Sequence, residues 1–340
     1  MRDVLDDIER WRAEKRPVAL ATVVATWGSA PRTVGGKMAV AADGRIAGSV
    51  SGGCVEGAVV EAARETLASG KARLFKFGVS DDTAWSVGLA CGGAIEILVE
   101  PLPEAIFGAV RDALRAERPV AVATVLRGAE GEVGRKLAVF ADGSTAGAID
   151  AAALEAARAA LADGRSRRVA IGDGEIFVDV LLPSPRLVVV GGVHIAVALV
   201  ALAKTLGYRA ILVDPREGFA NRKRFPHADE IVSAWPDEAL ARVGLNAGTA
   251  VAVLTHDPKL DDPAIVAALA SPAFYVGALG STRTQERRRA RLIAAGVGEA
   301  ALARLHAPIG LDLGGRSPEE IALAVMAQIV ATRNGGQVSQ

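Results

Sequence analysis

The sequence has few aromatic residues, few cysteines and no net charge, and each shortage excludes a class of protein. Aromatic residues make up 4% of the 340 residues while 51% are hydrophobic, so the core must be built mainly from aliphatic side chains. Two cysteines do not make a disulfide framework, which favours a reducing, cytoplasmic setting. The 39 basic and 39 acidic residues cancel, so the chain lacks the basic surface typical of proteins that bind nucleic acid.

Long hydrophobic runs are also scarce. The most apolar run, 187–203, is interrupted by Gly191, Gly192 and His194, and it is shorter than the roughly 20 residues that a membrane-spanning helix needs. The N-terminal segment 1–16 is charged and amphipathic, which is not typical of a signal peptide. We therefore expect neither a membrane span nor secretion.

The most informative stretch is GSVSGGCVEG at residues 48–57, which joins a predicted strand to a predicted helix at 54–68. The adjacent residues Gly52 and Gly53 allow a tight turn. Cys54 then falls at the first turn of the helix, where unpaired N–H groups and the helix dipole favour a thiolate or an anionic ligand. The alternative interpretation is a glycine turn followed by a buried structural cysteine.

The first half of the chain contains an internal repeat. The matching segments are RPVALATV (16–23) with RPVAVATV (118–125), and KMAV (37–40) with KLAV (136–139). Such self-similarity predicts that the front region, 1–183, consists of two copies of one α+β unit, about 1–103 and 104–183, that pack together.

The two copies differ at three loops, and the differences indicate a site in the first copy. Aligned on a shared Asp-Gly turn, residues 51–54 (SGGC) correspond to residues 150–153 (DAAA). The loop that contains Arg32 is shortened in the second copy, and the segment that contains Cys91 has no counterpart there. Because the second copy is expected to fold without these loops, we predict that they form one site that holds Arg32, Cys54 and Cys91.

The back half of the chain, 186–340, alternates apolar strands with helices, which predicts a Rossmann-like, doubly wound parallel sheet. Gly191 and Gly192 follow its first strand, and Asp214 comes 23 residues after Gly191, near the spacing of a ribose-binding acid. Val193 stands where the dinucleotide fingerprint needs its second glycine. The candidate ligands of this domain therefore include NAD(P), a nucleotide bound in another way, and a phosphate.

Three polar residues lie in loops that follow predicted strands of this domain, at the usual ligand edge of such a sheet. His194, beside the glycine turn, is either a ligand contact or a histidine that caps the start of the helix. His256 and Asp257 either contact a ligand or form a turn before a proline.

A second glycine turn leads into a helix and carries Ser281 and Arg283, which together form a candidate anion site. The same helix continues with the arginine run at 287–291. Consecutive cations on one helix are usually solvated, so we expect these arginines to form an exposed helix face rather than a binding patch.

Together these motifs resemble the XdhC/CoxI family, accessory proteins of molybdenum hydroxylases such as xanthine dehydrogenase and carbon monoxide dehydrogenase. The resemblance covers nearly the whole chain and is carried by ATVVATWGSAPR (21–32), GSVSGGCVEG (48–57), GLACGG (88–93), GGVHIA (191–196), THD (255–257), GALGSTR (277–283) and IGLDLG (309–314). This chain has GGVH where the family typically has GAGH, and Ser-Thr-Arg where many members have Ser-Arg-Arg.

The resemblance implies a protein that binds the molybdenum cofactor (molybdopterin), stabilises it, supports its sulfuration and delivers it to an apo molybdenum hydroxylase. It implies that Cys54 is a molybdenum ligand or the principal catalytic, sulfur-handling residue, with Cys91 as its partner. The residues expected to bind a cofactor are Arg32, Ser51, Gly52, Gly53, Gly92, Gly191, Gly192, His194, Asp214, His256, Asp257, Ser281 and Arg283. A cysteine desulfurase is a further expected partner, and the composition is compatible with a homodimer.

Two other functions stay open. An NAD(P)-dependent oxidoreductase that works from the back domain predicts NAD(P) binding that depends on Asp214. A scaffold that docks a desulfurase and a hydroxylase predicts that both cysteines can be replaced without effect. A zinc site is not expected, because two cysteines and four scattered histidines lack closely paired ligand spacing.

Overall fold

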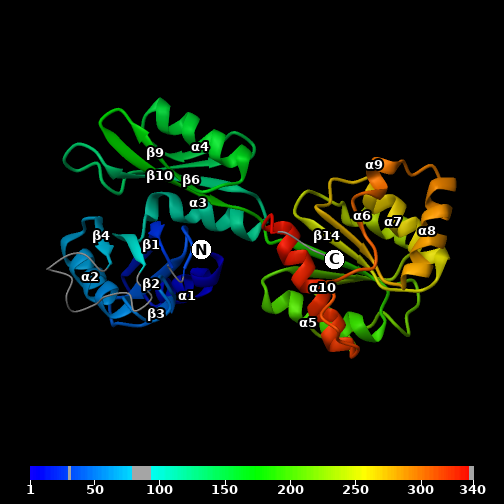
Figure 1. Cartoon of the computed structure of the whole chain (residues 1–340). Helices are drawn as coiled ribbons and strands as arrows, with labels where there is room; N and C mark the ends of the chain where they lie inside the picture. The colour runs from blue at the N-terminus through cyan, green and yellow to red at the C-terminus, as the bar shows by residue number, and fades with distance from the viewer. Residues whose placement is uncertain (30–31, 79–92, 337–340) are drawn as a thin grey trace. The chain divides into compact units, whose positions relative to one another are not determined.

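The structure is a computed structural model that describes residues 1–29, 32–78 and 93–336. The chain divides into two compact units, Met1–Pro183 and Ser184–Gln340 (Figure 1). The first unit holds two five-stranded antiparallel sheets, and the second holds a six-stranded parallel sheet. The predicted fold class, two tandem α+β units followed by a Rossmann-like sheet, is confirmed. No helix in these three described ranges is long and apolar enough to cross a membrane.

The first copy of the repeat forms a sheet with the strand order β3-β2-β1-β5-β4. Its elements are α1 (Arg2–Ala13), β1 (Val18–Trp27), β2 (Lys37–Ala41), β3 (Ile46–Gly48), α2 (Glu56–Ser69), β4 (Arg73–Phe77) and β5 (Ala94–Pro101). Val59 and Ala63 of α2 pack on valines, alanines and isoleucines from β1, β2 and β5. The helix α2 therefore covers one face of this sheet.

The second copy repeats this arrangement, with the strand order β8-β7-β6-β10-β9. Its elements are α3 (Glu104–Arg115), β6 (Val120–Arg127), β7 (Lys136–Phe140), β8 (Thr145–Gly147), α4 (Ala151–Asp163), β9 (Arg167–Ile171) and β10 (Gly174–Leu181). Gly48 and Gly147 end corresponding strands. A Cβ atom on either would lie 2.4 Å from a backbone oxygen, that of Lys37 or of Lys136 respectively. The two copies therefore need a glycine at the same point, the end of this strand.

The two copies share a hydrophobic core that includes α1 and α3 together with the second faces of both sheets. Two buried ion pairs cross between the copies. Lys37 of the first copy pairs with Asp179 of the second at 2.7 Å, and Lys136 of the second pairs with Glu100 of the first at 2.9 Å. Each copy thus supplies one lysine and one acid to the other.

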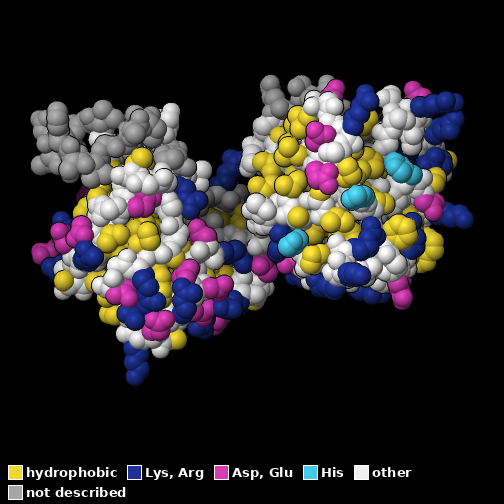
Figure 2. All heavy atoms as spheres, turned by 90° about the horizontal axis from the view of Figure 1, so that it is seen from below, with side chains coloured by type: hydrophobic (Ala, Val, Ile, Leu, Met, Phe, Trp, Pro, Cys, Tyr) yellow, Lys and Arg dark blue, Asp and Glu magenta, His cyan; other side chains and the backbone are white. Residues whose placement is uncertain are grey.

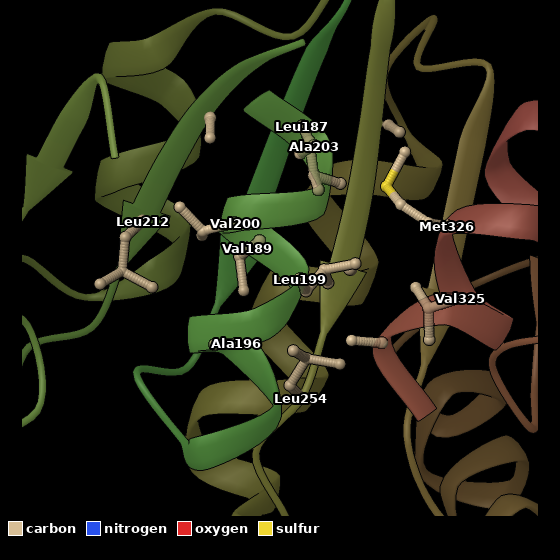
Figure 3. Close-up of a cluster of buried hydrophobic side chains, with 14 of the residues drawn as sticks. Leu187, Val189, Ala196, Leu199, Val200, Ala203, Leu212, Leu254, Val325 and Met326 are labelled. Atoms are coloured by element: carbon tan, nitrogen blue, oxygen red, sulfur yellow. The ribbon is translucent and has the colours of Figure 1, made fainter. Parts of the chain in front are cut away.

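The second unit is a parallel sheet with the order β13-β12-β11-β14-β15-β16, covered by helices on both faces. Its elements are β11 (Arg186–Val190), α5 (His194–Thr205), β12 (Arg209–Val213), β13 (Glu230–Val232), α6 (Pro236–Val243), β14 (Thr249–Val253), α7 (Pro258–Leu269), β15 (Tyr275–Ala278), α8 (Thr282–Ala294), α9 (Glu299–Leu302), β16 (Leu305–His306) and α10 (Pro318–Arg333). In Figure 3, Leu187 and Val189 of β11 face α5, while Val325 and Met326 come from α10 on the same side. The other face packs on α6, α7 and α8.

Candidate functional site

The Cys54 corner, which we define as residues 49–56, lies between β3 and α2 of the first copy. Gly52 has φ +88° and Gly53 has φ +123°, both in the left-handed region that residues with a Cβ rarely adopt. The helix α2 consequently begins at Glu56, two residues later than predicted. Cys54 is not in the first helical turn but on the exposed loop before it. The alternative of a buried structural cysteine is therefore wrong.

The side chain of Glu56 organises this loop. Its carboxylate accepts hydrogen bonds from the backbone N–H groups of Ser51, Gly52 and Gly53 at 2.9, 3.0 and 2.9 Å, and from the hydroxyls of Ser49 and Ser51. Partial burial raises the pKa of Glu56, but hydrogen bonds from Ser51 and Ser49 outweigh burial and hold that pKa at about 2. Glu56 is therefore a carboxylate at neutral pH.

Glu56 changes the interpretation of the glycine turn. The N–H groups of Gly52 and Gly53, which the sequence assigns to an anionic ligand, are already bonded to an internal anion. The sequence analysis missed this role, although a signal was present. A glutamate three residues after Gly53 has the spacing of a capping box, in which the carboxylate reaches back to an N–H group before the helix.

The second copy shows what the corner becomes without glycines. Its helix α4 begins at Ala151, and the carboxylate of Asp150 caps it by accepting a hydrogen bond from the N–H of Ala153 at 2.7 Å. Ala153 corresponds to Cys54 and is fully buried. Copy one therefore unwinds the first turn of the helix and exposes a thiol at the position where copy two buries a methyl group.

Arg32 lies at the Cys54 corner, as predicted. Its Nε donates a hydrogen bond to the backbone oxygen of Ser49 at 3.0 Å, and its Nη2 lies 3.5 Å from a carboxylate oxygen of Asp3. In copy two, Arg135 donates to the corresponding oxygen, that of Ala148, at 3.3 Å. Holding the end of the strand is therefore one role of Arg32. Cys91 and Gly92, its other predicted companions in the site, lie outside the described residues.

The glycine turn of the second unit packs against the protein itself. A Cβ atom on Gly191, whose φ is +107°, would lie 2.4 Å from Cγ2 of Thr255. A Cβ atom on Gly192 would lie 2.4 Å from the backbone oxygen of Phe219. These glycines permit close contact between segments of this chain, which alone accounts for their presence without a pyrophosphate.

Asp214 lies at the end of β12, as a ribose-binding acid would, but its carboxylate is 1% exposed and already bonded. It accepts hydrogen bonds from the N–H of Gly192 at 2.8 Å and from Nε and Nη2 of Arg216 at 2.8 and 2.7 Å. Burial raises the pKa of Asp214, but the bonds from Arg216 and Gly192 lower it further, so the carboxylate is charged. This arrangement does not favour the NAD(P) interpretation.

The remaining predicted residues lie at the carboxyl edge of the parallel sheet. His194 is the exposed first residue of α5 and does not cap it, since Val193 is the N-cap and has no side-chain cap bond. Asp257 caps α7 by accepting from the N–H of Lys259 at 3.0 Å, which supports the turn interpretation for that residue. His256 is exposed beside it. Exposed histidines are seen on the face of this unit presented in Figure 2.

The predicted anion site at Ser281 and Arg283 lies at the start of α8. Ser281 is the N-cap and accepts from the N–H of Thr284 at 3.4 Å, while Arg283 is exposed. The expectation of a fully solvated arginine run is wrong for Arg288. That side chain is 2% exposed and pairs with the buried carboxylate of Asp261 at 2.8 Å. The pair ties α8 to α7 beneath the two loops.

Two family models match the chain and together cover both units. The model of the XdhC and CoxI family matches residues 11–78 and 113–172, and the model of the XdhC Rossmann domain matches residues 187–329. The chain belongs to the XdhC and CoxI family. The first match spans residues of both copies of the repeat, including Cys54, and the second spans the whole doubly wound sheet up to α10.

Two relatives and one solved structure that resemble this XdhC-family chain are named for xanthine dehydrogenase or for the molybdenum cofactor. It is 29% identical over 330 residues to a probable xanthine dehydrogenase subunit from Bacillus subtilis, with 94% of each chain covered. It is 28% identical over 323 residues to the molybdenum cofactor insertion chaperone PaoD of Escherichia coli, with 92% of this chain and 83% of PaoD covered. A crystal structure from Bacillus halodurans, described as a xanthine dehydrogenase, superposes with a TM-score of 0.79 at 24% identity over 99% of this chain and 97% of that one. That last likeness shows the shared fold.

Within residues 1–29, 32–78 and 93–336, this XdhC-family chain has no group of three or more His, Cys, Asp or Glu side chains that could hold a metal ion.

Proposed function

We propose that this protein takes part in molybdenum cofactor maturation by binding the cofactor at the Cys54 corner. In this proposal the protein stabilises the cofactor, supports its sulfuration with a cysteine desulfurase as the sulfur donor, and delivers it to an apo molybdenum hydroxylase. The coarser part of this role, molybdenum cofactor maturation, is supported by the family and by the similarity to PaoD. The finer steps and the residues assigned to them are our proposal.

The observation that carries the proposal is the difference between the two copies. Copy two shows that this α+β unit folds with a regular helix start and a buried alanine, Ala153. Copy one replaces this with two glycines in left-handed conformations and an exposed Cys54. Only glycine adopts these conformations readily, so the pair keeps residues 52 and 53 out of the helix. The exposed thiol is the product of that change.

The residues of the corner fit the metal end of the cofactor better than its anionic tail. The sulfur of an exposed cysteine is a soft metal ligand and can also carry sulfur. The guanidinium of Arg32, with 39% of its side chain exposed, offers a nearby positive charge. The N–H groups of Ser51, Gly52 and Gly53 would bind an anionic tail only if Glu56 moved away, so we assign these three residues to shaping the loop that presents Cys54.

Delivery is tested by activation of an apo molybdenum hydroxylase. The protein is purified from cells that make the cofactor and is mixed with hydroxylase prepared from cells that lack this chain. We expect the wild-type protein to activate the hydroxylase and the Cys54→Ala variant to retain less than about a tenth of that activation, because the variant has lost the ligand. The Cys91→Ala variant is expected to lose activation as well.

A matched control is Glu61→Ala, which changes an exposed side chain on α2 that pairs with Arg64. This variant should activate the hydroxylase as well as the wild-type protein. If the Cys54→Ala and Cys91→Ala variants do the same, the chain acts as a docking scaffold, and the proposal of a cysteine-based cofactor site is wrong.

A further inference from the structure

A wide groove lies between the two copies of the repeat, on the first unit. Its volume is about 570 Å³, within the range of roughly 300 to 1,000 Å³ that is usual for small-molecule sites. The first copy contributes Trp27, Val34 and Lys76 to its lining, and the second contributes Arg127 and Arg168. We call it the Trp27 groove.

The large aromatic side chain of Trp27 is exposed to solvent. The chain has four tryptophans among few aromatic residues, yet 48% of the Trp27 surface is exposed. The strand β1 runs two residues further than its counterpart β6. Trp27 is the last of these extra residues and pairs with Ala94. Like the exposed Cys54, this indole belongs to the first copy only.

The side chains around the indole carry a surplus of positive charge. Arg168 donates hydrogen bonds to both Glu96 and Glu175, which satisfies the two acids of the groove. Arg127 is 64% exposed and lies 3.7 and 3.9 Å from these acids, beyond hydrogen-bond distance. Lys76 has its ammonium 5.6 Å from the centre of the Trp27 ring and no carboxylate partner among the described residues. Among the described residues, Lys76 therefore has no carboxylate partner and Arg127 makes only two long ion pairs, beside an exposed aromatic ring.

We propose that the Trp27 groove binds a flat, negatively charged heterocycle, whose ring stacks on the indole of Trp27 and whose anionic group pairs with Lys76 and Arg127. Aromatic side chains beside cations bind heterocycles with phosphate tails in this way in other proteins. The identity of this ligand rests on the proposed function, which makes the pterin phosphate of the molybdenum cofactor the expected one. Arg32 follows Trp27 by five residues and lies at the Cys54 corner, where its Nε donates a hydrogen bond to the backbone oxygen of Ser49. The groove would then hold the organic part that the glycine turn has no free N–H groups to bind.

The test uses pterin-6-carboxylate, a fluorescent pterin with one carboxylate, and follows its fluorescence anisotropy with the full-length protein and no molybdenum. We expect one binding site in the wild-type protein. The Trp27→Ala variant should bind at least about tenfold more weakly, because base–aromatic stacking is lost, whereas Trp27→Phe should keep most of the affinity. The Lys76→Ala/Arg127→Ala variant should bind more weakly and depend less on salt. Trp235→Ala, at an exposed tryptophan of the other unit, is the matched control and should bind normally.

Two results would overturn the inference: no binding of the pterin to the wild-type protein, or unchanged affinity in Trp27→Ala. Equally tight binding of adenosine monophosphate would overturn the pterin as the ligand and assign the groove to nucleotides. The outcome is separable from that of the proposed function. If the protein carries molybdenum cofactor in a Cys54-dependent way but Trp27→Ala binds the pterin normally, only the groove assignment fails. If the pterin binds through Trp27 but no cofactor is carried from the cell, only the proposed function fails.

Discussion

The Gly52→Ala/Gly53→Ala variant is expected to fold and to lose most of the chemical reactivity of its Cys54 thiol. Alanine disfavours the left-handed conformations of both glycines, φ +88° and +123°. In the second copy, alanines stand at the corresponding positions. The helix there begins as early as Ala151, and Ala153 is buried. We expect α2 to extend in the same way, so that the thiol reacts only after local opening and at least about tenfold more slowly.

The measurement is the rate of reaction with a disulfide reagent, made in a Cys91→Ala background because the chain has two cysteines. The matched control is Gly57→Ala. Gly57 lies inside α2, and a Cβ atom there would meet nothing within 4 Å, so this change should leave the rate unaltered and stabilise the helix by about 0.5–1 kcal/mol. An unchanged rate in the double variant would mean that the glycines are not what exposes the thiol.

Breaking one of the two buried ion pairs between the copies is expected to have the largest effect on stability. Lys136 and Glu100 are 9% and 3% exposed in their side chains, and Lys136 also donates to the hydroxyl of Thr124 at 2.6 Å. Burial lowers the pKa of Lys136, although Glu100 raises it. The Lys136→Met variant leaves the Glu100 carboxylate buried without its partner, which typically costs about 3–5 kcal/mol of unfolding free energy.

A double-mutant cycle in the full-length chain, followed by urea unfolding, measures this coupling. We expect the Lys136→Met/Glu100→Leu variant to be considerably more stable than Lys136→Met alone, because both charges are removed together. The control is Arg73→Met, which breaks an exposed pair with Glu65 in the same unit and should cost less than about 1 kcal/mol. Equal losses in the buried and exposed cases would show that these ion pairs do not fix the packing of the two copies.

The reciprocal pairing also explains why the repeat packs as it does. Lys37 and Lys136 occupy equivalent strand positions, opposite Thr22 and Thr124 respectively, and each reaches an acid of the other copy. A self-complementary contact of this kind is the form that a two-fold symmetric dimer takes. The two pairs border a cavity of about 40 Å³, which has room for no more than a few water molecules. The space beside the two ion pairs is thus filled by protein side chains rather than by a ligand.

Much of the fold could be predicted from the sequence, because it depends on local patterns. Uninterrupted apolar strands, glycine turns and the echo of RPVALATV by RPVAVATV were sufficient to predict the repeat and the parallel sheet. The start of α2 was predicted two residues too early. The reason is that Gly52 and Gly53 were recognised as a turn, but the length of helix that they remove depends on their φ values.

The parts of the site that could not be predicted depend on which hydrogen-bond partner each buried or half-buried polar group has in the folded chain. The carboxylate of Glu56 accepts hydrogen bonds from the N–H groups of the glycine turn. That of Asp214 accepts from the N–H of Gly192 and from the side chain of Arg216, and that of Asp261 accepts from Arg288. These choices require the three-dimensional arrangement of the loops. Spacing along the chain placed Asp214 at the correct edge of the sheet but gave no sign that its hydrogen-bonding capacity was already used.

The most direct test of a cofactor site at Cys54 is the amount of molybdenum and pterin that purifies with the wild-type protein and with Cys54→Ala from cells that make the cofactor. We predict that both are present in the wild-type protein and lost together in the variant, while the variant remains folded. Equal amounts in the two proteins would contradict the assignment of Cys54 as the ligand. The absence of pterin from both, with tight NAD(P) binding instead, would move the function to the second unit.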